Sequence, residues 1–192
     1  MKGRDFLETE YLGKTFLYPI QGFFQNNYEM AEKMQEYVFQ LLEKYPENNG
    51  MLLDLYGGVG TFGIINAEKY KEVLIIESVK EAIESAKKNS EINKRTNTKV
   101  LLLDAKQLAR VELKSPLYVI TDPPRSGMDQ KTISTLQQQK PEAIIYISCN
   151  PQQLAKDLPK LRDYEIKSAA LFDLFPQTPH SEAIVELIKK GI

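Results

Sequence analysis

The sequence contains very little of the two side chains that most often bind metals or form disulfides. Its 192 residues include one cysteine, Cys149, one histidine, His180, and no tryptophan. A single cysteine excludes a disulfide within the chain and any zinc or iron–sulfur site that needs several of the chain's own cysteines. A lone histidine is usually structural, so we expect no metal site.

Long apolar runs and an excess of charge of one sign are also lacking. No run approaches the roughly 20 apolar residues needed to cross a bilayer, and no signal peptide opens the chain. The 25 basic and 26 acidic residues leave a net charge of −1, so the chain as a whole has no basic footprint for nucleic acid. A local basic patch can still lie within a neutral total. These features predict a cytoplasmic protein with no membrane partner.

The sequence does contain a regular alternation of strand-like and helix-like segments, and its length suits one domain with a single large core. Alternation of this length predicts a doubly wound α/β sandwich around a mostly parallel sheet of seven strands. The last two strands are expected to form an antiparallel pair. The strands are expected at 51–56, 73–77, 99–103, 117–121, 143–147, 164–174 and 182–188, and the helices at 61–69, 79–94, 131–138 and 151–161. The helix at 79–94 is amphipathic, with Ile83, Ala86 and Ile92 on its apolar face.

The first 50 residues predict a hairpin followed by a helix. Residues 4–24 alternate around Leu12-Gly13-Lys14, which is typical of a hairpin. Residues 25–27 can cap a helix whose apolar positions are Met30, Met34, Val38 and Leu41, and a turn cluster follows at 46–50. We therefore expect one domain over residues 1–192, with a hairpin at 1–24 and a core at 25–192.

A glycine-rich turn follows the first strand of the alternation. Residues 54–61 read DLYGGVGT, and the three glycines Gly57, Gly58 and Gly60 would let the backbone pass close to a ligand before the next helix. In a doubly wound sheet, ligands bind outside the carboxyl ends of the strands. Glu77 ends the next strand, where its carboxylate suits hydrogen bonds to ribose hydroxyls. The turn is a weak signal by itself, because dinucleotide folds share it and a tight turn needs no ligand.

A further acidic residue favours S-adenosylmethionine over a dinucleotide. Asp104 ends the third strand, and the turn departs from the G-x-G-x-x-G spacing of pyrophosphate-binding loops. A pyrophosphate requires bare amides and a helix dipole, whereas a nucleoside with a sulfonium and an amino acid tail favours carboxylates and backbone carbonyls. Taken alone, Asp104 is equally well explained as a helix cap.

Cys149 lies where a buried strand meets a turn that reads SCNP. Taken alone, a free cysteine is more often a small core residue than a nucleophile, because reactivity needs a lowered pKa or a specific partner. The preceding strand ends in TDPPRSGM, where two prolines rigidify the loop after Asp122. The guanidinium of Arg125 in this loop suits a phosphate or a base edge, although a plain turn is the alternative. Glu182 alone would be a solvated charge at a strand edge.

Together these motifs resemble the catalytic domain of the RNA uridine-5-methyltransferases, which make 5-methyluridine in tRNA and ribosomal RNA. The ordered combination of DPPR, SCNP and FPxTxHxE is highly specific. The matches cover nearly the whole chain and comprise Leu12-Gly13, residues 23–27 and 54–63, Glu77, Asp104, and residues 122–127, 148–151 and 175–182.

The resemblance implies a Rossmann-like methyltransferase fold, S-adenosylmethionine as cofactor and RNA as substrate. It also implies that Cys149 is the nucleophile and Glu182 the general base. With Gly57 from the glycine turn, the residues expected at the cofactor are Gln25, Tyr56, Gly57, Thr61, Glu77, Asp104 and Asp122. Those expected at the substrate are Arg125, Asn150 and His180.

The same resemblance implies a covalent mechanism that explains these residue types. Carbon 5 of uracil is a poor nucleophile, and addition of a thiolate to carbon 6 makes carbon 5 reactive as part of an enolate. A base must then remove the proton from carbon 5 so that the thiol can leave, and a carboxylate within hydrogen-bond reach suits that step. The target base must also leave its stack.

Family members commonly carry an N-terminal RNA-binding module and a central domain, and we expect this chain to lack them. RNA capture is therefore expected to use a separate RNA-binding domain or subunit. Residues 153 and 156 are Gln and Lys, where Thr and Arg are more usual in the family. Two other functions stay open. One is methyl transfer to an exocyclic amino group of RNA or DNA, which needs no thiol; the other is a non-catalytic cofactor-binding scaffold, which needs neither Cys149 nor Glu182.

Overall fold

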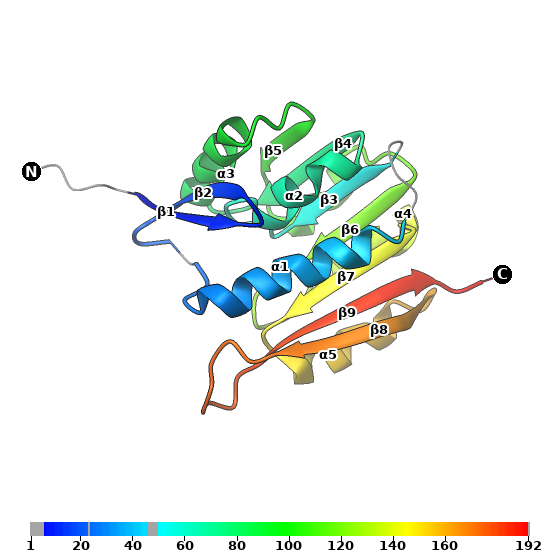
Figure 1. The fold of residues 1–192 in the computed structure, drawn as a ribbon. Coiled ribbons are helices and arrows are strands. Elements are labelled where there is room, and N and C mark those ends of the chain that lie inside the picture. Colours follow the sequence, from blue (N-terminus) through cyan, green and yellow to red (C-terminus); the bar gives the residue numbers. More distant parts are fainter. Residues whose placement is uncertain (1–5, 23, 46–49, 192) are drawn as a thin grey trace, which may run out of the picture.

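The computed structural model describes residues 6–22, 24–45 and 50–191. Over these ranges a two-stranded hairpin precedes a sheet of seven strands (Figure 1). The strands are β1 Phe6–Tyr11, β2 Lys14–Pro19, β3 Met51–Leu55, β4 Glu72–Glu77, β5 Thr98–Leu102, β6 Leu117–Thr121, β7 Ala143–Ser148, β8 Tyr164–Phe172 and β9 Glu182–Lys189. The helices are α1 Tyr28–Leu42, α2 Thr61–Asn66, α3 Lys80–Ile92, α4 Gln130–Gln139 and α5 Pro151–Asp157, with 3₁₀ turns η1 Ala67–Lys69, η2 Ala105–Arg110 and η3 Leu158–Lys160.

The sheet has the order β5-β4-β3-β6-β7-β9-β8, in which β3 to β7 are parallel and the last two strands antiparallel. The chain runs outward from β3 through β4 to β5, then returns to the other side of β3 and continues through β6 and β7. The strand order therefore reverses beside β3. The predicted doubly wound sandwich with a C-terminal antiparallel pair and a preceding hairpin is confirmed.

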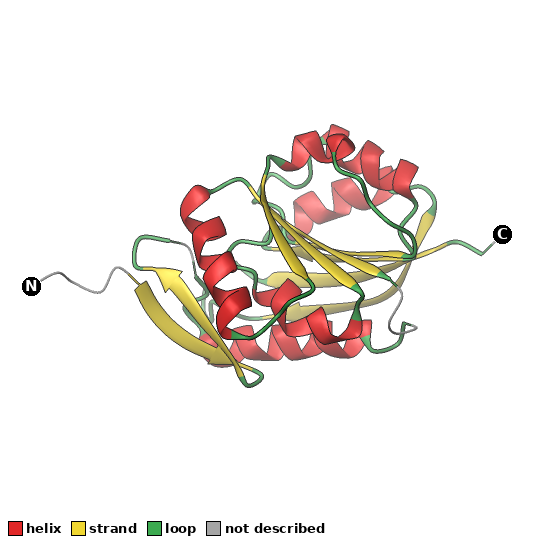
Figure 2. Cartoon of the chain, turned by 90° about the horizontal axis from the view of Figure 1, so that it is seen from above, coloured by secondary structure: helices red, strands yellow, loops and turns green. Residues whose placement is uncertain are grey.

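Helices cover both faces of the sheet (Figure 2). Helices α1 and α2 lie in front of the central strands in Figure 1, α4 lies behind β6 and β7, and α5 lies behind β8 and β9. Every residue of β3, β6 and β7 is buried, as expected for parallel strands that are covered on both faces. This double burial explains why these segments read as nearly continuous apolar runs, interrupted in β3 by the buried Asp54.

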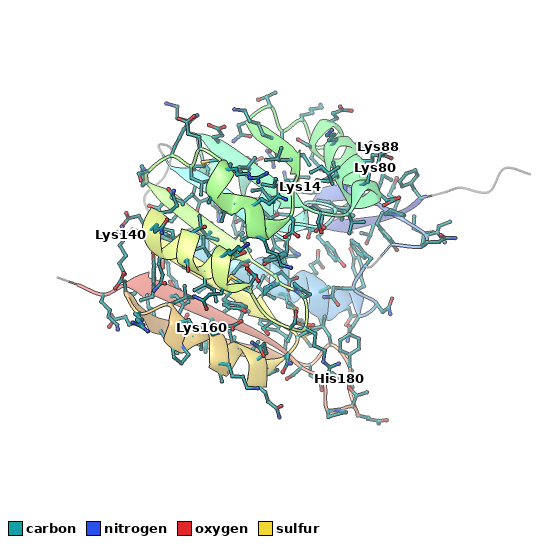
Figure 3. The ribbon with its side chains drawn as sticks, turned by 180° about the vertical axis from the view of Figure 1, so that it is seen from behind. Lys14, Lys80, Lys88, Lys140, Lys160 and His180 are labelled. Atoms are coloured by element: carbon teal, nitrogen blue, oxygen red, sulfur yellow. The ribbon has the colours of Figure 1, made fainter. Side chains whose placement is uncertain are left out.

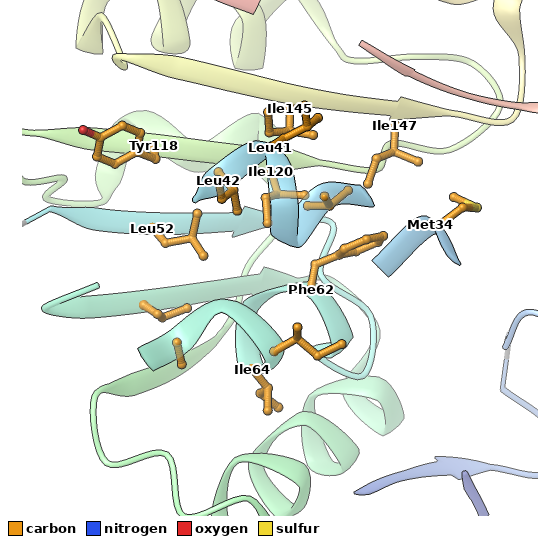
Figure 4. Close-up of a cluster of buried hydrophobic side chains, with 14 of the residues drawn as sticks. Met34, Leu41, Leu42, Leu52, Phe62, Ile64, Tyr118, Ile120, Ile145 and Ile147 are labelled. Atoms are coloured by element: carbon orange, nitrogen blue, oxygen red, sulfur yellow. The ribbon is translucent and has the colours of Figure 1, made fainter. Parts of the chain in front are cut away.

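The sequence of helix α1 explains where the helix begins and which of its faces packs on the sheet. Asn27 is its N-cap, and the side-chain oxygen accepts a hydrogen bond from the Met30 amide at 3.3 Å. The apolar positions Met34 and Leu41 then face the sheet, where they pack in a cluster that includes Ile120 and Ile145 (Figure 4). Burying one such side chain contributes about 1.5–3 kcal/mol. The expected turn at 46–50 lies mostly outside the described residues, since only Gly50 falls within them.

The buried face of helix α3 differs from the predicted one. Ile92, expected on the buried face, is 44% exposed. The inward position one turn earlier is taken by Asn89, whose side chain is fully buried and bonds both the N–H and the C=O of Leu17 in the hairpin. The same amide donates to the carbonyl of Val59 in the glycine turn at 3.0 Å. A buried asparagine therefore docks the hairpin on α3, while Ile92 lies toward solvent.

Three 3₁₀ turns follow or replace predicted elements in the described residues. The 3₁₀ turn η2 was not predicted, and two predicted helices, 61–69 and 151–161, end in the 3₁₀ turns η1 and η3. Within the described ranges, no helix is long and apolar enough to cross a membrane.

Candidate active site

A cavity of about 940 Å³ opens at the carboxyl ends of the parallel strands, where the strand order reverses. Its wall includes residues that directly follow β3, β6 and β7, and residues from the hairpin and α1 cover it from one side. This is where ligands bind in doubly wound sheets. The volume lies within the range of small-molecule and cofactor sites.

Nine of the twelve site residues expected from the sequence line this one cavity. They are Gln25, Tyr56, Gly57, Thr61, Glu77, Asp104, Asp122, Cys149 and Glu182. The other three, Arg125, Asn150 and His180, are not part of its lining. The sheet topology explains the convergence, because strands far apart in the sequence end at the same edge.

Cys149 and Glu182 face each other across two antiparallel strands. Ser148, the last residue of β7, pairs with Ala183 of β9. One step further along each strand places Cys149 opposite Glu182, the first residue of β9. The Cys149 side chain is half-buried and Glu182 is only 5% exposed. A thiol and a carboxyl thus share one corner of the cavity.

Asp122, Glu182 and the Cys149 thiol lie where burial disfavours negative charge. Burial raises the pKa of Asp122 to about 7. Burial also raises the pKa of Glu182 to about 7, and the charge of Asp122 contributes to that shift. The pKa of the Cys149 thiol is raised by burial first, then by Glu182 and Asp122, while Arg125 acts in the opposite direction. A cationic ligand beside these groups would stabilise their ionised forms.

The loop that carries Cys149 is fixed by its neighbours. The Ser148 hydroxyl accepts a hydrogen bond from the Asn150 amide and donates to the Asn150 carbonyl, both at 3.1 Å. The Asn150 side chain caps α5 by accepting from the Gln153 amide. It also donates to the carbonyl of Arg125 at 3.1 Å. The geometry therefore gives Asn150 a positioning role, since it joins the cysteine loop to the loop after β6.

Arg125 and His180 lie at the edge of the site. The Arg125 side chain is exposed, and it is the backbone carbonyl that contacts the cysteine loop. His180 is exposed on the loop between β8 and β9 (Figure 3), where its ring packs edge-on against Phe175 with the ring centroids 6.4 Å apart. Contact of either side chain with a substrate stays a prediction.

Glu77, the last residue of β4, and Asp104, just after β5, both line the cavity and both accept hydrogen bonds from backbone amides. Glu77 accepts hydrogen bonds from the amide of Gly58 at 3.1 Å and from that of Val79 at 2.9 Å, so it holds the glycine turn and the start of α3. Asp104 caps η2 by accepting from the Lys106 amide at 2.9 Å. The cap that was weighed as an alternative for Asp104 is present, and the same residue lines the cavity.

Sequence reasoning missed Asp157, a fully buried carboxylate that joins three parts of the site. Its oxygens accept from the Met128 amide at 3.1 Å, the Tyr146 hydroxyl at 2.7 Å and the Lys160 ammonium at 2.7 Å. They also accept from the side chain of Gln153, which lines the cavity together with Lys160. An acidic residue on the inward face of the helix after SCNP was the signal that could have revealed it.

Gly127 is the position where this network leaves no room for a side chain. Its φ of +79° favours glycine, and a Cβ there would overlap an oxygen of Asp157 and lie 2.8 Å from Cγ of Gln153. Replacing Gly127 with alanine is expected to lower the free energy of unfolding by about 3 kcal/mol, from left-handed strain plus a displaced buried carboxylate. Urea unfolding measures this loss.

Gly58 provides the matched control for that substitution. Its φ is +55°, but a Cβ there would meet no atom within 4 Å. The change from Gly58 to alanine should therefore cost only the strain, about 1 kcal/mol. Equal losses for the two variants would contradict the steric argument.

The comparisons with known proteins identify the family of the chain. The family model described as tRNA (uracil-5-)-methyltransferase matches residues 4–190. The tRNA (uracil(54)-C(5))-methyltransferase of Pyrococcus horikoshii is 38% identical over 186 residues, covering 97% of this chain and 43% of the relative. A protein of Lactobacillus johnsonii described as an uncharacterized RNA methyltransferase is 37% identical, over 97% of this chain and 41% of the relative. The chain thus spans about two fifths of the length of these relatives.

A solved structure shows the same architecture at a sequence identity that supports relationship. The Pyrococcus abyssi tRNA (uracil-54, C5)-methyltransferase, crystallised in complex with S-adenosyl-L-homocysteine, superposes with a TM-score of 0.82 at 32% identity. The similarity covers 97% of this chain and 45% of that one.

Proposed function

Because the chain belongs to the tRNA (uracil-5-)-methyltransferase family, we propose that it transfers a methyl group from S-adenosylmethionine to carbon 5 of a uridine in tRNA or ribosomal RNA. The observation that carries this proposal is the register of β7 and β9, which sets Cys149 opposite Glu182 at the wall of one cavity. A nucleophile and a base side by side are what this reaction requires and a bare cofactor scaffold does not.

The cavity fits the cofactor in its polar groups. The side-chain oxygen of Gln25 is buried against the cavity and has no hydrogen-bond partner among the described residues. Burial raises the pKa values of Asp122 and Glu182, so the ionised form of each carboxyl group is disfavoured in the cavity. A ligand that brings N–H donors and positive charge resolves both features.

We assign the cofactor's parts along the sheet edge. Asp104 lies at the adenine, Glu77 at the ribose hydroxyls, and Asp122 toward the charged sulfur, in the spatial order of β5, β4 and β6. Gln25 and Thr61 hold the amino acid tail. When bound, S-adenosylmethionine supplies an electrophilic methyl group on a positively charged sulfur.

The first chemical role belongs to Cys149. Its thiolate forms a bond to carbon 6 of the uracil ring, and the ring's electron pair moves so that carbon 5 becomes nucleophilic as part of an enolate. Burial, and then the charges of Glu182 and Asp122, raise the pKa of this thiol, so positive charge in the cavity would favour its thiolate.

The second role belongs to Glu182. Carbon 5, once methylated, still carries its original hydrogen, and the Glu182 carboxylate accepts that proton. The electron pair of the broken carbon–hydrogen bond restores the double bond between carbons 5 and 6. The bond from carbon 6 to sulfur breaks, and Cys149 leaves as a thiolate. Cys149 is then ready for another cycle, and Glu182 becomes a base again once it releases the proton to solvent.

The remaining residues hold this pair in place. Asn150 joins the cysteine loop to the loop after β6, and Asp157 ties that second loop to β7 and η3. The net charge of −1 gives the chain no overall basic footprint. We therefore propose that a separate RNA-binding domain or subunit contributes to RNA capture, and that the target uridine is unstacked or flipped when it reaches Cys149.

The direct test supplies the protein with S-adenosylmethionine carrying a trideuterated methyl group and with tRNA or ribosomal RNA transcripts. The RNA is then digested to nucleosides for mass spectrometry. Deuterated 5-methyluridine supports the proposal. A methylated amino group on adenosine, guanosine or cytidine points instead to an amino-group methyltransferase. Cofactor binding without labelled nucleoside, on RNA from cells as well as on transcripts, indicates a scaffold.

A further inference from the structure

The buried face of α1 contains one polar side chain, and it lies at the cavity. Gln35 is on the face formed by Ala31, Met34, Val38 and Leu41, and it is only 6% exposed. Met34 and Phe62, which line the cavity beside it, are seen in Figure 4 where α1 meets α2. A glutamine at this position departs from the apolar pattern of the helix, which is the signal that sequence reasoning overlooked.

The two ends of the Gln35 amide have different surroundings. Its NH₂ group donates a hydrogen bond to the Thr61 hydroxyl at 3.2 Å, which fixes the orientation of the amide. Its oxygen is buried and has no partner among the residues that the structure describes. A buried acceptor without a donor is destabilising, so a ligand in the cavity is the natural source of one.

The other groups of the cavity wall near Gln35 indicate which chemical group of a ligand would donate to its oxygen. Gln25 presents a second unpaired amide oxygen to the same cavity, so this wall offers acceptors. The cations among the cavity-lining residues, Lys106 and Lys160, belong to the region of η2 and η3 on the other face of the sheet. A wall of acceptors without a cation suits an ammonium group, which has three N–H donors, better than a carboxylate.

We propose that the side-chain oxygen of Gln35 binds the α-ammonium group of the cofactor's amino acid tail, with Thr61 holding the amide in the required orientation. This assignment rests on the proposed cofactor. It adds a cofactor-binding residue from the middle of α1, outside every motif found in the sequence. It also explains why a buried glutamine occupies a face that otherwise packs on the sheet.

The test compares three ligands by isothermal titration calorimetry. S-adenosylhomocysteine has the whole tail, its deamino analogue lacks only the α-amino group, and 5′-methylthioadenosine lacks the tail's amino acid. The Gln35→Leu variant should bind S-adenosylhomocysteine about 10- to 100-fold more weakly, as loss of a charge-assisted hydrogen bond predicts. Its affinity for the other two ligands should stay within about twofold of wild type.

Gln40→Leu is the matched control, because Gln40 is an exposed residue of the same helix and does not line the cavity. It should leave all three affinities unchanged. If Gln35→Leu weakens the three ligands equally, Gln35 has only a structural role and the inference fails. Unchanged binding of S-adenosylhomocysteine also overturns it, while the proposed function stands.

Two measurements keep the test decisive. If Gln35→Leu does not fold, as judged by circular dichroism, Gln35→Met replaces it, and the wild-type protein alone must still prefer S-adenosylhomocysteine to the deamino analogue by about tenfold or more. No such preference overturns the inference. If wild type binds none of the ligands, the proposed cofactor itself is wrong, which is a distinct result.

Discussion

Replacing Cys149 with alanine is expected to abolish formation of 5-methyluridine while S-adenosylhomocysteine still binds. The thiol is the only group of its kind in the chain, and it faces Glu182 across the end of β7 and β9. Without the covalent bond to carbon 6, carbon 5 stays a poor nucleophile, so the rate should fall by about 10⁴-fold or more. Single-turnover assays with mass spectrometry of the nucleosides measure the rate.

A trapped covalent adduct between Cys149 and RNA would show the bond that the alanine variant cannot form. In RNA containing 5-fluorouridine, the fluorine at carbon 5 cannot be removed as a proton, so the bond to Cys149 should persist after methylation. Wild type should give a protein–RNA complex that survives denaturing electrophoresis, and Cys149→Ala should give none. Ser148→Ala is the control, because it removes the hydroxyl that bonds the Asn150 backbone but keeps the thiol. If Cys149→Ala forms 5-methyluridine at the full rate, Cys149 is not the nucleophile; full methylation of an amino group instead would identify an amino-group methyltransferase.

The fold was predictable because its strongest signals are local. Strands covered on both faces, such as β3, β6 and β7, are apolar at nearly every position. The 3₁₀ turn η2 gave no such signal. It is short, it depends on the Asp104 cap, and its Leu108 is buried by contacts with distant parts of the chain. Ile92 was misplaced because a buried asparagine on α3 serves the hairpin and not the core.

Some residues of the site were predictable from local sequence signals, and others were not. Residues at strand ends, such as Glu77 and Asp122, were predictable because the topology alone brings those ends together. Gln35 reaches the cavity only through the packing of α1 on the sheet, and Asp157 through a network of hydrogen bonds between distant segments. Contacts of that kind depend on distances in three dimensions, which spacing along the chain does not give.

Replacing Glu182 with glutamine is expected to stop the reaction after methyl transfer. Glutamine has nearly the same shape but cannot accept the proton from carbon 5, so elimination of Cys149 should slow by about 10²- to 10⁴-fold. A covalent protein–RNA complex carrying the methyl group should then accumulate with ordinary, unfluorinated RNA. Denaturing electrophoresis and intact-mass spectrometry detect it. Glu186→Gln is the control, because Glu186 is a buried carboxylate of the same strand that bonds Tyr45 and Ser168 and does not line the cavity.

The pH dependence of the elimination step separates a base from a merely structural carboxylate. Burial raises the pKa of Glu182 to about 7, so the group is ionised and able to accept a proton above that pH and protonated below it. The rate at which preformed adduct releases wild-type enzyme should therefore fall about tenfold for each pH unit below 7. The slow release from Glu182→Gln should lack this dependence, since its amide does not titrate. Rapid release by that variant, or an equal slope in both proteins, would remove Glu182 from the role of base and leave the proton to another acceptor.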